Sequence, residues 1–442
     1  MVGNDGARPR GPRTSTPGRL LLWIALPILG VLACGLLLTT SIGGLRDNIG
    51  VVGTQAEPQV VAASRLSFDL ASMDGQAADI LLVGDAAGLS ETRSGAYQRF
   101  ESDQADADKQ LELVGSGIEQ VPNGPATYLA IETGLSQYTQ YVSFAMYIAD
   151  QAHGQKSGQP PSAALQAYDH ASALLNTDGT GAQAQAEQLF IGEQEAESRP
   201  SDDGSATIWH LQLGCALLIA FIVVTLVLVQ RRLSRVFRRM VNPLLALTTI
   251  TTLIFGVLLF SALGAAKSSY DALNLNGPTS VVTLWNTRAT TADMNASESR
   301  WLLDAGNPSA QPTSTPAAEQ QKFTSDDQSV MSTQPSGNVA TEFSTYTADD
   351  THLRSLINGG STSLDAQISE AVAYKTATSD AAYATYDADL AQVIGVEQQA
   401  FAVSTAHGEN GLVSWLWLPW LWMAATIALI LLGSAPRLRE YR

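Results

Sequence analysis

Four long apolar runs constrain the fold of this chain more than any other feature of its sequence. They cover residues 20–45, 208–230, 243–266 and 412–433, and none of them contains Asp, Glu, Lys or Arg. A helix needs about 20 apolar residues to cross the hydrocarbon core of a bilayer. It also satisfies its own backbone hydrogen bonds, as lipid requires. The sequence therefore predicts an all-α membrane protein with four transmembrane helices.

A short basic segment between the second and third runs predicts the topology. Residues 231–242 read RRLSRVFRRMVN and carry five arginines. Because arginine beside a membrane span stays on the cytoplasmic side, we expect this loop and both termini to face the cytoplasm. The charge distribution agrees, since 12 of the 25 Lys and Arg residues lie in the tails and the loop, whereas all but two of the 42 acidic residues lie elsewhere. We therefore expect a multi-pass protein of the cell membrane with two large extracytoplasmic segments.

The apolar runs and the basic loop together give the predicted segments. In chain order, these are a disordered basic tail (1–18), a first transmembrane helix (19–45), a first extracytoplasmic segment (46–207), a second transmembrane helix (208–230), the cytoplasmic loop (231–242), a third transmembrane helix (243–266), a second extracytoplasmic segment (267–411), a fourth transmembrane helix (412–433) and a cytoplasmic tail (434–442). The acidity of the outer segments disfavours nucleic acid as a partner, and it also serves to keep these segments soluble.

Matching residues at fixed spacings indicate an internal repeat. An ungapped offset of 221 residues places identical residues on each other outside the membrane runs: Val60-Val61 on Val281-Val282, Ala71 on Ala292, Met73 on Met294, and Leu81-Leu82 on Leu302-Leu303. After the second and fourth runs, an offset of 205 places Arg232-Leu233 on Arg437-Leu438. The sequence therefore predicts two tandem hairpin units, each with an extracytoplasmic domain between two membrane helices.

Apolar residues recur at helical spacing through both outer segments. Apolar residues recur at steps of three and four at Tyr128, Ile131, Leu135, Tyr138, Val142, Ala145 and Ala149, which is typical of a helix facing a core. Gly- and Pro-containing breaks divide each segment into four helices, with a flexible stretch at 306–335 in the second. We expect a domain resembling a four-helix bundle in each, because such a bundle brings its first and last helices to the same end. Tyr138, Trp285 and Trp301 are more consistent with core residues than with the lining of a pocket.

Catalytic chemistry is not indicated anywhere in the chain. The five histidines have no metal-ligand spacing, and there is no phosphate-binding loop, nucleophile elbow or zinc-binding helix motif. Cys34 and Cys215 both fall in apolar runs, so neither a disulfide framework nor a thiolate metal site is expected. We predict a non-enzymatic protein with no catalytic, metal or cofactor site. Membrane spans without a charged residue also disfavour transport.

Residues 295–303 read NASESRWLL, and the predicted layout has two tandem units, outward bundles, inward termini and a short basic loop. In this combination the chain resembles the GlnX family of actinobacterial membrane proteins. The resemblance implies that the chain links an extracytoplasmic amino-acid-binding lipoprotein, GlnH, to a soluble Ser/Thr kinase, PknG. It further implies that the outer bundles are docking surfaces for that solute-binding lipoprotein. A helical bundle that continues into membrane helices can pass a shift of about 1–2 Å across the bilayer.

The loop arginines are the candidate contact for a cytoplasmic partner. They are Arg231, Arg232, Arg235, Arg238 and Arg239. Topological anchoring and attraction to anionic lipid, worth about 1 kcal/mol per residue, are by themselves sufficient to explain them. We expect a transmembrane signalling adaptor, with a structural or envelope-organising protein, or an accessory subunit of a transporter, as alternatives. The sequence identifies no ligand-binding residue and leaves homo-oligomerisation open.

Overall fold

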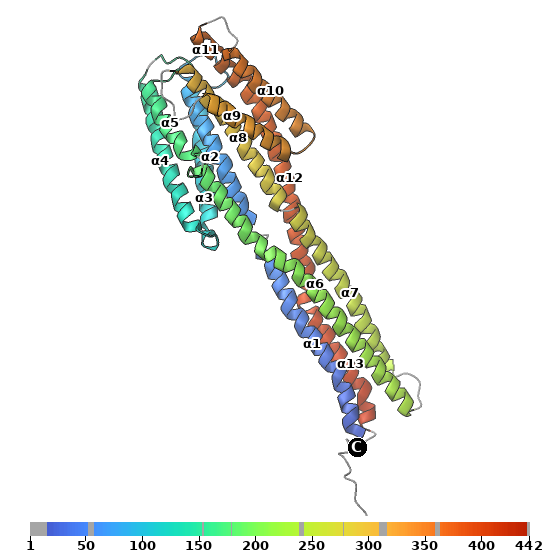
Figure 1. Ribbon diagram of the computed structural model, residues 1–442. Coiled ribbons are helices and arrows are strands. Elements are labelled where there is room, and N and C mark those ends of the chain that lie inside the picture. Colours follow the sequence, from blue (N-terminus) through green and yellow to red (C-terminus); the bar gives the residue numbers. More distant parts are fainter. Residues whose placement is uncertain are drawn as a thin grey trace, which may run out of the picture. The chain divides into compact units, whose positions relative to one another are not determined.

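The computed structural model describes residues 16–51, 57–152, 154–177, 179–237, 243–276, 278–308, 316–358 and 363–439. Within these ranges the chain is all-helical and contains no strand (Figure 1), which confirms the predicted all-α class. The chain separates into two compact units. Unit 1 comprises residues 1–50, 201–271 and 404–442, and unit 2 comprises residues 51–200 and 272–403.

Unit 1 contains the helices that could cross a membrane. They are α1 (Thr16–Val51), the second part of α6 (Ala182–Phe237), most of α7 (Pro243–Asn276), and α13 (Leu418–Arg439), which a short turn, η4 (Ser414–Leu416), precedes. The stretches that are long and apolar enough to span a bilayer are Trp23–Gly44, Trp209–Arg232, Pro243–Ala265 and Ser414–Ala435. These four candidate spans agree in number and position with the four apolar runs of the sequence and indicate a membrane protein.

One apolar cluster joins the four helices of unit 1. Leu38, Leu226, Leu259 and Ile430 are buried in it, one from each helix. The ring of Phe255 on α7 stacks on the ring of Trp422 on α13, with centroids 4.2 Å apart and an interplanar angle of 5°. Packing of this kind holds apolar helices together where the surrounding lipid is as apolar as the side chains themselves.

Unit 2 contains the remaining helices. From the first half of the chain these are α2 (Glu57–Val83), α3 (Arg93–Gly115), the turn η2 (Ile118–Gln120), α4 (Gly124–Gln151), α5 (Ser162–Asn176) and the start of α6; from the second half they are α8 (Pro278–Gly306), α9 (Pro316–Thr333), α10 (Asn338–Asn358), α11 (Leu364–Tyr374), the π-helical turn η3 (Lys375–Ser379) and most of α12 (Asp380–Val413). The sequence favoured a flexible stretch at 306–335, but residues 316–333 form α9. Buried Phe323 and Val330 hold this helix in the core of the unit.

The two outer segments pack together in a single unit. Their first helices, α2 and α8, lie side by side (Figure 1). Where they approach most closely, a Cβ atom on Gly75 would lie only 3.4 Å from the Cα atom of Ala296. The residues that match at the 221-residue offset outside the membrane runs all lie on these two helices, and all are buried. The sequence alone did not show whether the segments pack on each other; the structure places this contact at the centre of unit 2.

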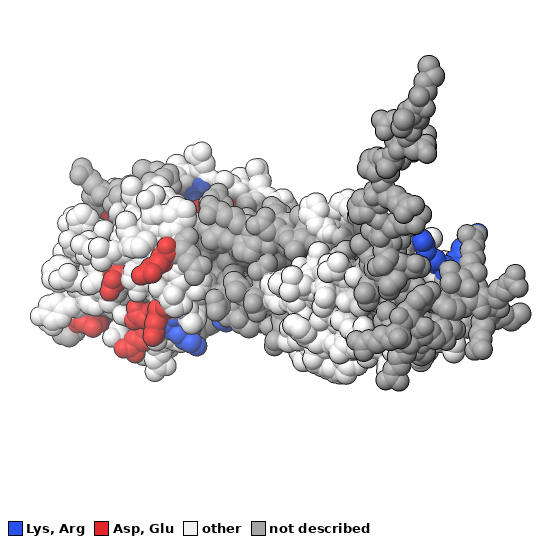
Figure 2. Space-filling view, turned by 90° about the horizontal axis from the view of Figure 1, so that it is seen from below, with Lys and Arg blue, Asp and Glu red and all other residues white. Residues whose placement is uncertain are grey.

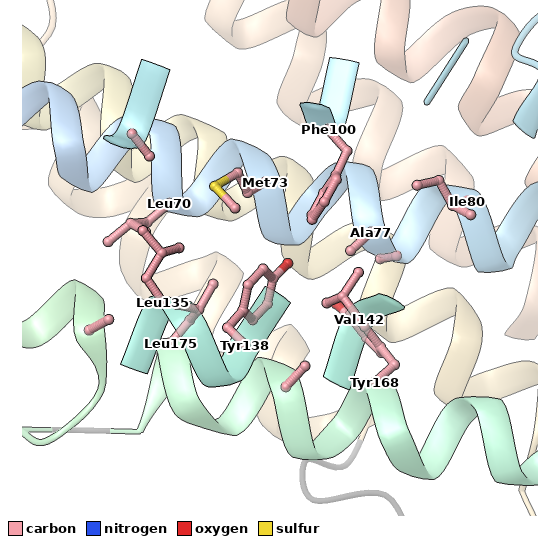
Figure 3. Packing of buried hydrophobic residues seen from close by; sticks show 14 of the residues in the cluster. Leu70, Met73, Ala77, Ile80, Phe100, Leu135, Tyr138, Val142, Tyr168 and Leu175 are labelled. Atoms are coloured by element: carbon pink, nitrogen blue, oxygen red, sulfur yellow. The ribbon is translucent and has the colours of Figure 1, made fainter. Parts of the chain in front are cut away.

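The helical stripe that the sequence indicated in α4 faces the core of unit 2. Leu135, Tyr138 and Val142 are buried against α2 and α5, and Tyr138 is wholly inaccessible to solvent (Figure 3). The ring of Tyr138 lies beside that of Phe100 on α3, with centroids 6.4 Å apart. The periodicity therefore predicted both the helix and its buried face, and Tyr138 is a core residue.

Candidate functional site

A cavity of about 650 Å³ opens in unit 2 between α2, α3, α8 and the start of α12. We call it the charged cavity. Its lining includes seven acidic, four basic and three aromatic side chains: Asp69, Asp79, Glu91, Asp103, Asp106, Asp380 and Asp387; Arg65, Arg99, Lys109 and Arg288; and Phe68, Trp285 and Tyr383. Its volume lies in the range of small-molecule sites, which is about 300–1,000 Å³.

Two arginines and two aromatic rings form a stack along one side of the charged cavity. The guanidinium carbon of Arg65 lies 4.6 Å from the ring centroid of Trp285, and that of Arg288 lies 4.1 Å from the ring centroid of Phe68. Arg288 also donates two hydrogen bonds to Asp387, at 2.6 and 2.7 Å. A bidentate pair of this kind fixes the plane of the guanidinium group. This side of the cavity is therefore rigid, and its cations already have partners.

The part of the charged cavity that α2 and α3 form carries acidic side chains. Asp69, Asp103 and Asp106 line it, and none of them forms an ion pair with a basic side chain in the described part of the chain. The Ser72 hydroxyl donates a hydrogen bond of 2.7 Å to Asp103. Asp69 is only 7% exposed, and its Oδ2 atom has no hydrogen-bond partner among the described residues. We call these three carboxyl groups the acidic wall.

Two carboxyl groups of the acidic wall, those of Asp69 and Asp103, hold protons more tightly than free carboxyl groups do. Burial raises the pKa of Asp69 to about 8, and the negative charges of Asp106 and Asp103 add to this rise. Burial also raises the pKa of Asp103 to about 6, although the hydrogen bond from Ser72 opposes the change. Because removal from water disfavours the charged form, Asp69 keeps its proton to a higher pH than an exposed carboxyl group does.

A buried lysine contacts residues that line the charged cavity. Lys375 is the first residue of the π-helical turn η3, and its side chain is wholly buried. Its Nζ atom pairs with Asp380 and lies 3.8 Å from the Oδ1 atom of Asp79. It also donates a hydrogen bond of 3.2 Å to the side-chain oxygen of Asn295. Asp79 and Asp380 thus share one cation within the protein.

A second cavity, of about 510 Å³, lies between α2, α8, α9, the end of α5 and the start of α6. We call it the polar cavity. Its described lining contains no aromatic residue and one basic residue, Lys322. Its lining positions correspond to those of the charged cavity at fixed spacings. A spacing of 221 residues relates α2 to α8: Arg65, Phe68, Asp69 and Ser72 of the charged cavity correspond to Asn286, Ala289, Thr290 and Asp293 of the polar cavity. A spacing of 223 residues relates α3 to α9: Arg99, Asp103 and Asp106 correspond to Lys322, Asp326 and Ser329. A spacing of 205 residues relates Asn176 and Gly179 of the polar cavity to Ala381 and Ala384 of the charged cavity.

Arg300 organises a buried charge cluster beside the polar cavity. Its guanidinium group pairs with Asp74 at 2.6 Å, Asp293 at 3.1 Å and Glu319 at 3.2 Å. Asp74 is wholly buried and accepts further hydrogen bonds from α5, donated by Tyr168, Ser172 and Asn176 at 3.2, 3.1 and 2.8 Å. Arg300 lies in the stretch 295–303 that carried the family resemblance, so part of that stretch forms the core of unit 2.

The aromatic residues singled out in the sequence have different positions. Trp285 lines the charged cavity, although it is only 4% exposed. Trp301 is buried beneath the guanidinium group of Arg354, which lies 4.8 Å from its ring centroid. Among the described residues there is no group of three or more His, Cys, Asp or Glu side chains arranged to hold a metal ion.

The loop arginines are described only in part. Arg231 and Arg232 lie in the last turns of α6 and are exposed. The guanidinium carbon of Arg232 lies 5.4 Å from the ring centroid of Trp23 on α1. Arg235 lies in α6, but its side chain, and the whole of Arg238 and Arg239, fall outside the described part. The predicted contact with a cytoplasmic partner therefore stays a prediction.

Comparison with protein families bears on unit 2. Residues 48–200, about a third of the chain, match the model of the actinobacterial sensor domain. The match covers α2 to α5 and the start of α6. No curated protein and no solved structure matches the chain. The match indicates a sensor-like actinobacterial protein, and it supports a sensing or signalling role for a membrane protein.

Sequence reasoning did not find the charged cavity. Its residues come from both halves of the chain, and abundant acids on helices are usually a solvated surface. A signal was present, however. Where α2 carries Arg65, Phe68 and Asp69, the 221-residue offset places smaller, uncharged residues on α8. Such a local difference inside a matching region marks positions whose chemistry has changed.

Proposed function

We propose that this chain is a transmembrane sensor without catalytic activity, which reports an extracytoplasmic nutrient signal to a separate cytoplasmic protein. The match of residues 48–200 to a sensor domain carries the proposal. That stretch supplies two of the helices around the charged cavity, α2 and α3. The helix α6 then leads along the chain from unit 2 into a candidate membrane span.

The proposed topology places unit 2 outside the cell and the segment 231–242 inside. The positive charge of that segment and of the tails supports this orientation. The described Asp and Glu side chains all belong to unit 2, and Figure 2 shows a group of them on the visible surface. An acidic surface of this kind would steer a partner with a complementary basic surface toward unit 2.

The proposed partners follow from the resemblance to the GlnX family. Outside, unit 2 would dock a solute-binding lipoprotein that carries an amino acid. Inside, Arg231, Arg232, Arg235, Arg238 and Arg239 would contact a soluble Ser/Thr kinase. A relay of this kind needs no catalytic residue in the chain itself, because the kinase performs the chemistry.

The full-length protein in its native membrane tests this proposal. Replacing the five loop arginines by glutamine should lower kinase-dependent phosphorylation severalfold, while the same five replacements by lysine, which keep the charge for anchoring, should have a smaller effect. Protease protection of unit 2 would report the topology of each variant. Unchanged phosphorylation in the correctly inserted glutamine variant would overturn the contact. An inverted glutamine variant would show that the arginines act as anchors.

A second experiment addresses the partners directly. Gentle detergent extraction followed by affinity purification of the full chain should recover a solute-binding lipoprotein and a Ser/Thr kinase. Recovery of the kinase should fall in the glutamine variant, whereas recovery of the lipoprotein should not. Absence of both proteins from the purified material would argue for a structural role in the envelope.

A further inference from the structure

No basic side chain forms an ion pair with the acidic wall in the described part of the chain, although Lys109 also lines the charged cavity. Arg288 pairs with Asp387, Arg99 pairs with Glu91, and Lys375 pairs with Asp380. Arg65 lies on the face of Trp285. Asp69, Asp103 and Asp106 therefore remain as three carboxyl groups on one side of a cavity that is open to solvent.

Asp69 is the most informative of these groups. It lines the cavity from the middle of α2, it is more than nine-tenths buried, and its Oδ2 atom has no partner among the described residues. A buried polar atom without a hydrogen bond costs about 1–3 kcal/mol. Proteins generally satisfy such atoms, so a donor supplied by a ligand would remove this cost.

A metal ion does not fit the acidic wall. A bound Ca²⁺ or Mg²⁺ needs several oxygen ligands within about 2.0–2.6 Å, and the described side chains form no cluster with that arrangement. The cavity volume of about 650 Å³ is also that of an organic molecule. Trp285, Phe68 and Tyr383 supply apolar surface for such a molecule.

We propose that the charged cavity binds a short organic diammonium cation, with its ammonium groups on the acidic wall of Asp69, Asp103 and Asp106. An ammonium group donates three hydrogen bonds, which matches carboxylate acceptors that lack basic partners. Two such groups on a short alkyl chain would donate hydrogen bonds to several carboxylates at once, and the alkyl chain would lie against the aromatic side chains. The inference rests on the proposed sensing role of unit 2 and adds to it a small molecule that unit 2 binds directly.

The polar cavity provides the internal contrast for this assignment. Thr290 and Ser329 occupy the positions that correspond to Asp69 and Asp106, so only Asp326 retains a carboxyl group of the three. A positively charged side chain, Lys322, also lines the polar cavity, and it pairs with Asp293 at 2.6 Å. A diammonium cation should therefore distinguish the two cavities.

Isothermal titration calorimetry on the purified full chain in detergent, at pH 8, tests the proposal with 1,4-diaminobutane as the probe. The neutral analogue 1,4-butanediol controls for shape, and magnesium chloride controls for charge alone. We expect saturable binding of the diamine and none of either control. Asp69→Asn and Asp103→Asn should each weaken diamine binding at least tenfold. Asp326→Asn, the matched change in the polar cavity, should leave it within about twofold.

The proton balance gives a readout that a structural role would not move. A bound cation favours the charged form of Asp69, so binding should release protons, and the heat measured should depend on the ionisation enthalpy of the buffer. This dependence should diminish in Asp69→Asn. Asparagine has nearly the same volume as the protonated acid it replaces, and circular dichroism would verify that both variants fold.

Three outcomes would overturn the proposal. They are no diamine binding at millimolar concentration, equal binding of the diol, and an equal loss in Asp326→Asn and Asp69→Asn. The titration contains no kinase and no solute-binding lipoprotein. Failure of diamine binding would therefore leave the proposed relay intact, and failure of the relay experiments would leave the ligand assignment intact.

Discussion

The charged cavity and the polar cavity share two helices, α2 and α8, yet their linings differ in chemistry. The first contains seven acidic residues and three aromatic ones, and the second contains three acidic residues, with no aromatic one in its described lining. Corresponding positions carry Phe68 and Ala289, or Asp69 and Thr290. Similar helix packing therefore does not determine what a cavity can bind, because a few substitutions on the same face change its charge and surface.

The difference extends to the buried charges beside each cavity. Arg300 stands beside the polar cavity with three acidic partners, and the position 221 residues earlier carries Asp79, which lines the charged cavity. On that side the cation is Lys375, from a different helix. One side of the α2–α8 pair thus holds a cluster in which every acid has an ion-pair partner, and the other retains acids without an ion pair that face a cavity.

The largest effect is expected from removing the cation beside the polar cavity. Arg300→Met would leave Asp74, Asp293 and Glu319 buried without their shared partner, and breaking such a cluster costs about 3–5 kcal/mol. Lys375→Met should cost less, about 1–3 kcal/mol, because Asp380 is partly exposed and can be hydrated. Denaturation of the purified protein, followed by circular dichroism, would measure both. Equal losses would contradict the distinction between the two clusters.

The next effect concerns pH. The folded pKa of Asp69, about 8, lies above its ordinary value of 3.8. The folded state therefore binds the proton more tightly than the unfolded chain, and the free energy of unfolding should fall as the pH rises from about 4 to 8. One pKa unit corresponds to about 1.4 kcal/mol, so Asp69→Asn should gain a few kcal/mol over the wild type across this window.

Asp326 in the polar cavity provides the comparison for that experiment. Burial and the charge of Asp293 raise its pKa to about 7, although Lys322 opposes the change. Asp326→Asn should show the same direction as Asp69→Asn, with a smaller gain that is complete by about pH 7. Thermal melting at several pH values would measure both variants. The raised pKa values of Asp69 and Asp326 would be contradicted if the free energy of unfolding of the wild type rose between pH 5 and 8 and neither variant showed the expected gain over it.

The smallest effect is expected at the guanidinium stack. Arg288→Lys keeps the positive charge but loses the bidentate pair with Asp387 and the flat contact with Phe68. Lysine does not reproduce either interaction, and we expect a loss of about 1 kcal/mol. Ser67→Ala changes the corresponding position of the polar cavity and should be nearly neutral, since Ser67 bonds only within its own helix in the described part of the chain. Equal effects on the melting temperature would show that the stack adds no stability.

Much of the fold could be predicted because its signals are local. Each candidate span is a continuous apolar run, and the stripe through Leu135, Tyr138 and Val142 has the period of a helix. The helix at Pro316–Thr333 lies in a stretch that the sequence indicated to be flexible, and its sequence is rich in Ser, Thr and Gln. Its helical state depends on tertiary packing, through Phe323 against Tyr346, whose ring centroids lie 6.1 Å apart.

The candidate site could not be predicted because its signals are not local. Asp69 and Asp387 are separated by more than 300 residues, and only the packing of α2, α8 and α12 brings them to one cavity. Asp69 also looks like an ordinary surface acid in the sequence, since its neighbours at helical spacing include Arg65 and Ser72. Its burial depends on helices that the sequence did not place against α2.

The close approach of Gly75 and Ala296 joins residues separated by the same 221 positions that relate α2 to α8. A contact in which a residue meets its own counterpart is the hallmark of an isologous, two-fold dimer. Here both partners belong to one polypeptide. A homodimer must change both of its halves with every mutation, whereas a covalently linked pair can keep Asp69 in one half and Thr290 in the other. A fragment limited to residues 48–200 would expose the apolar face of α2, and we expect it to pair with a second copy of itself.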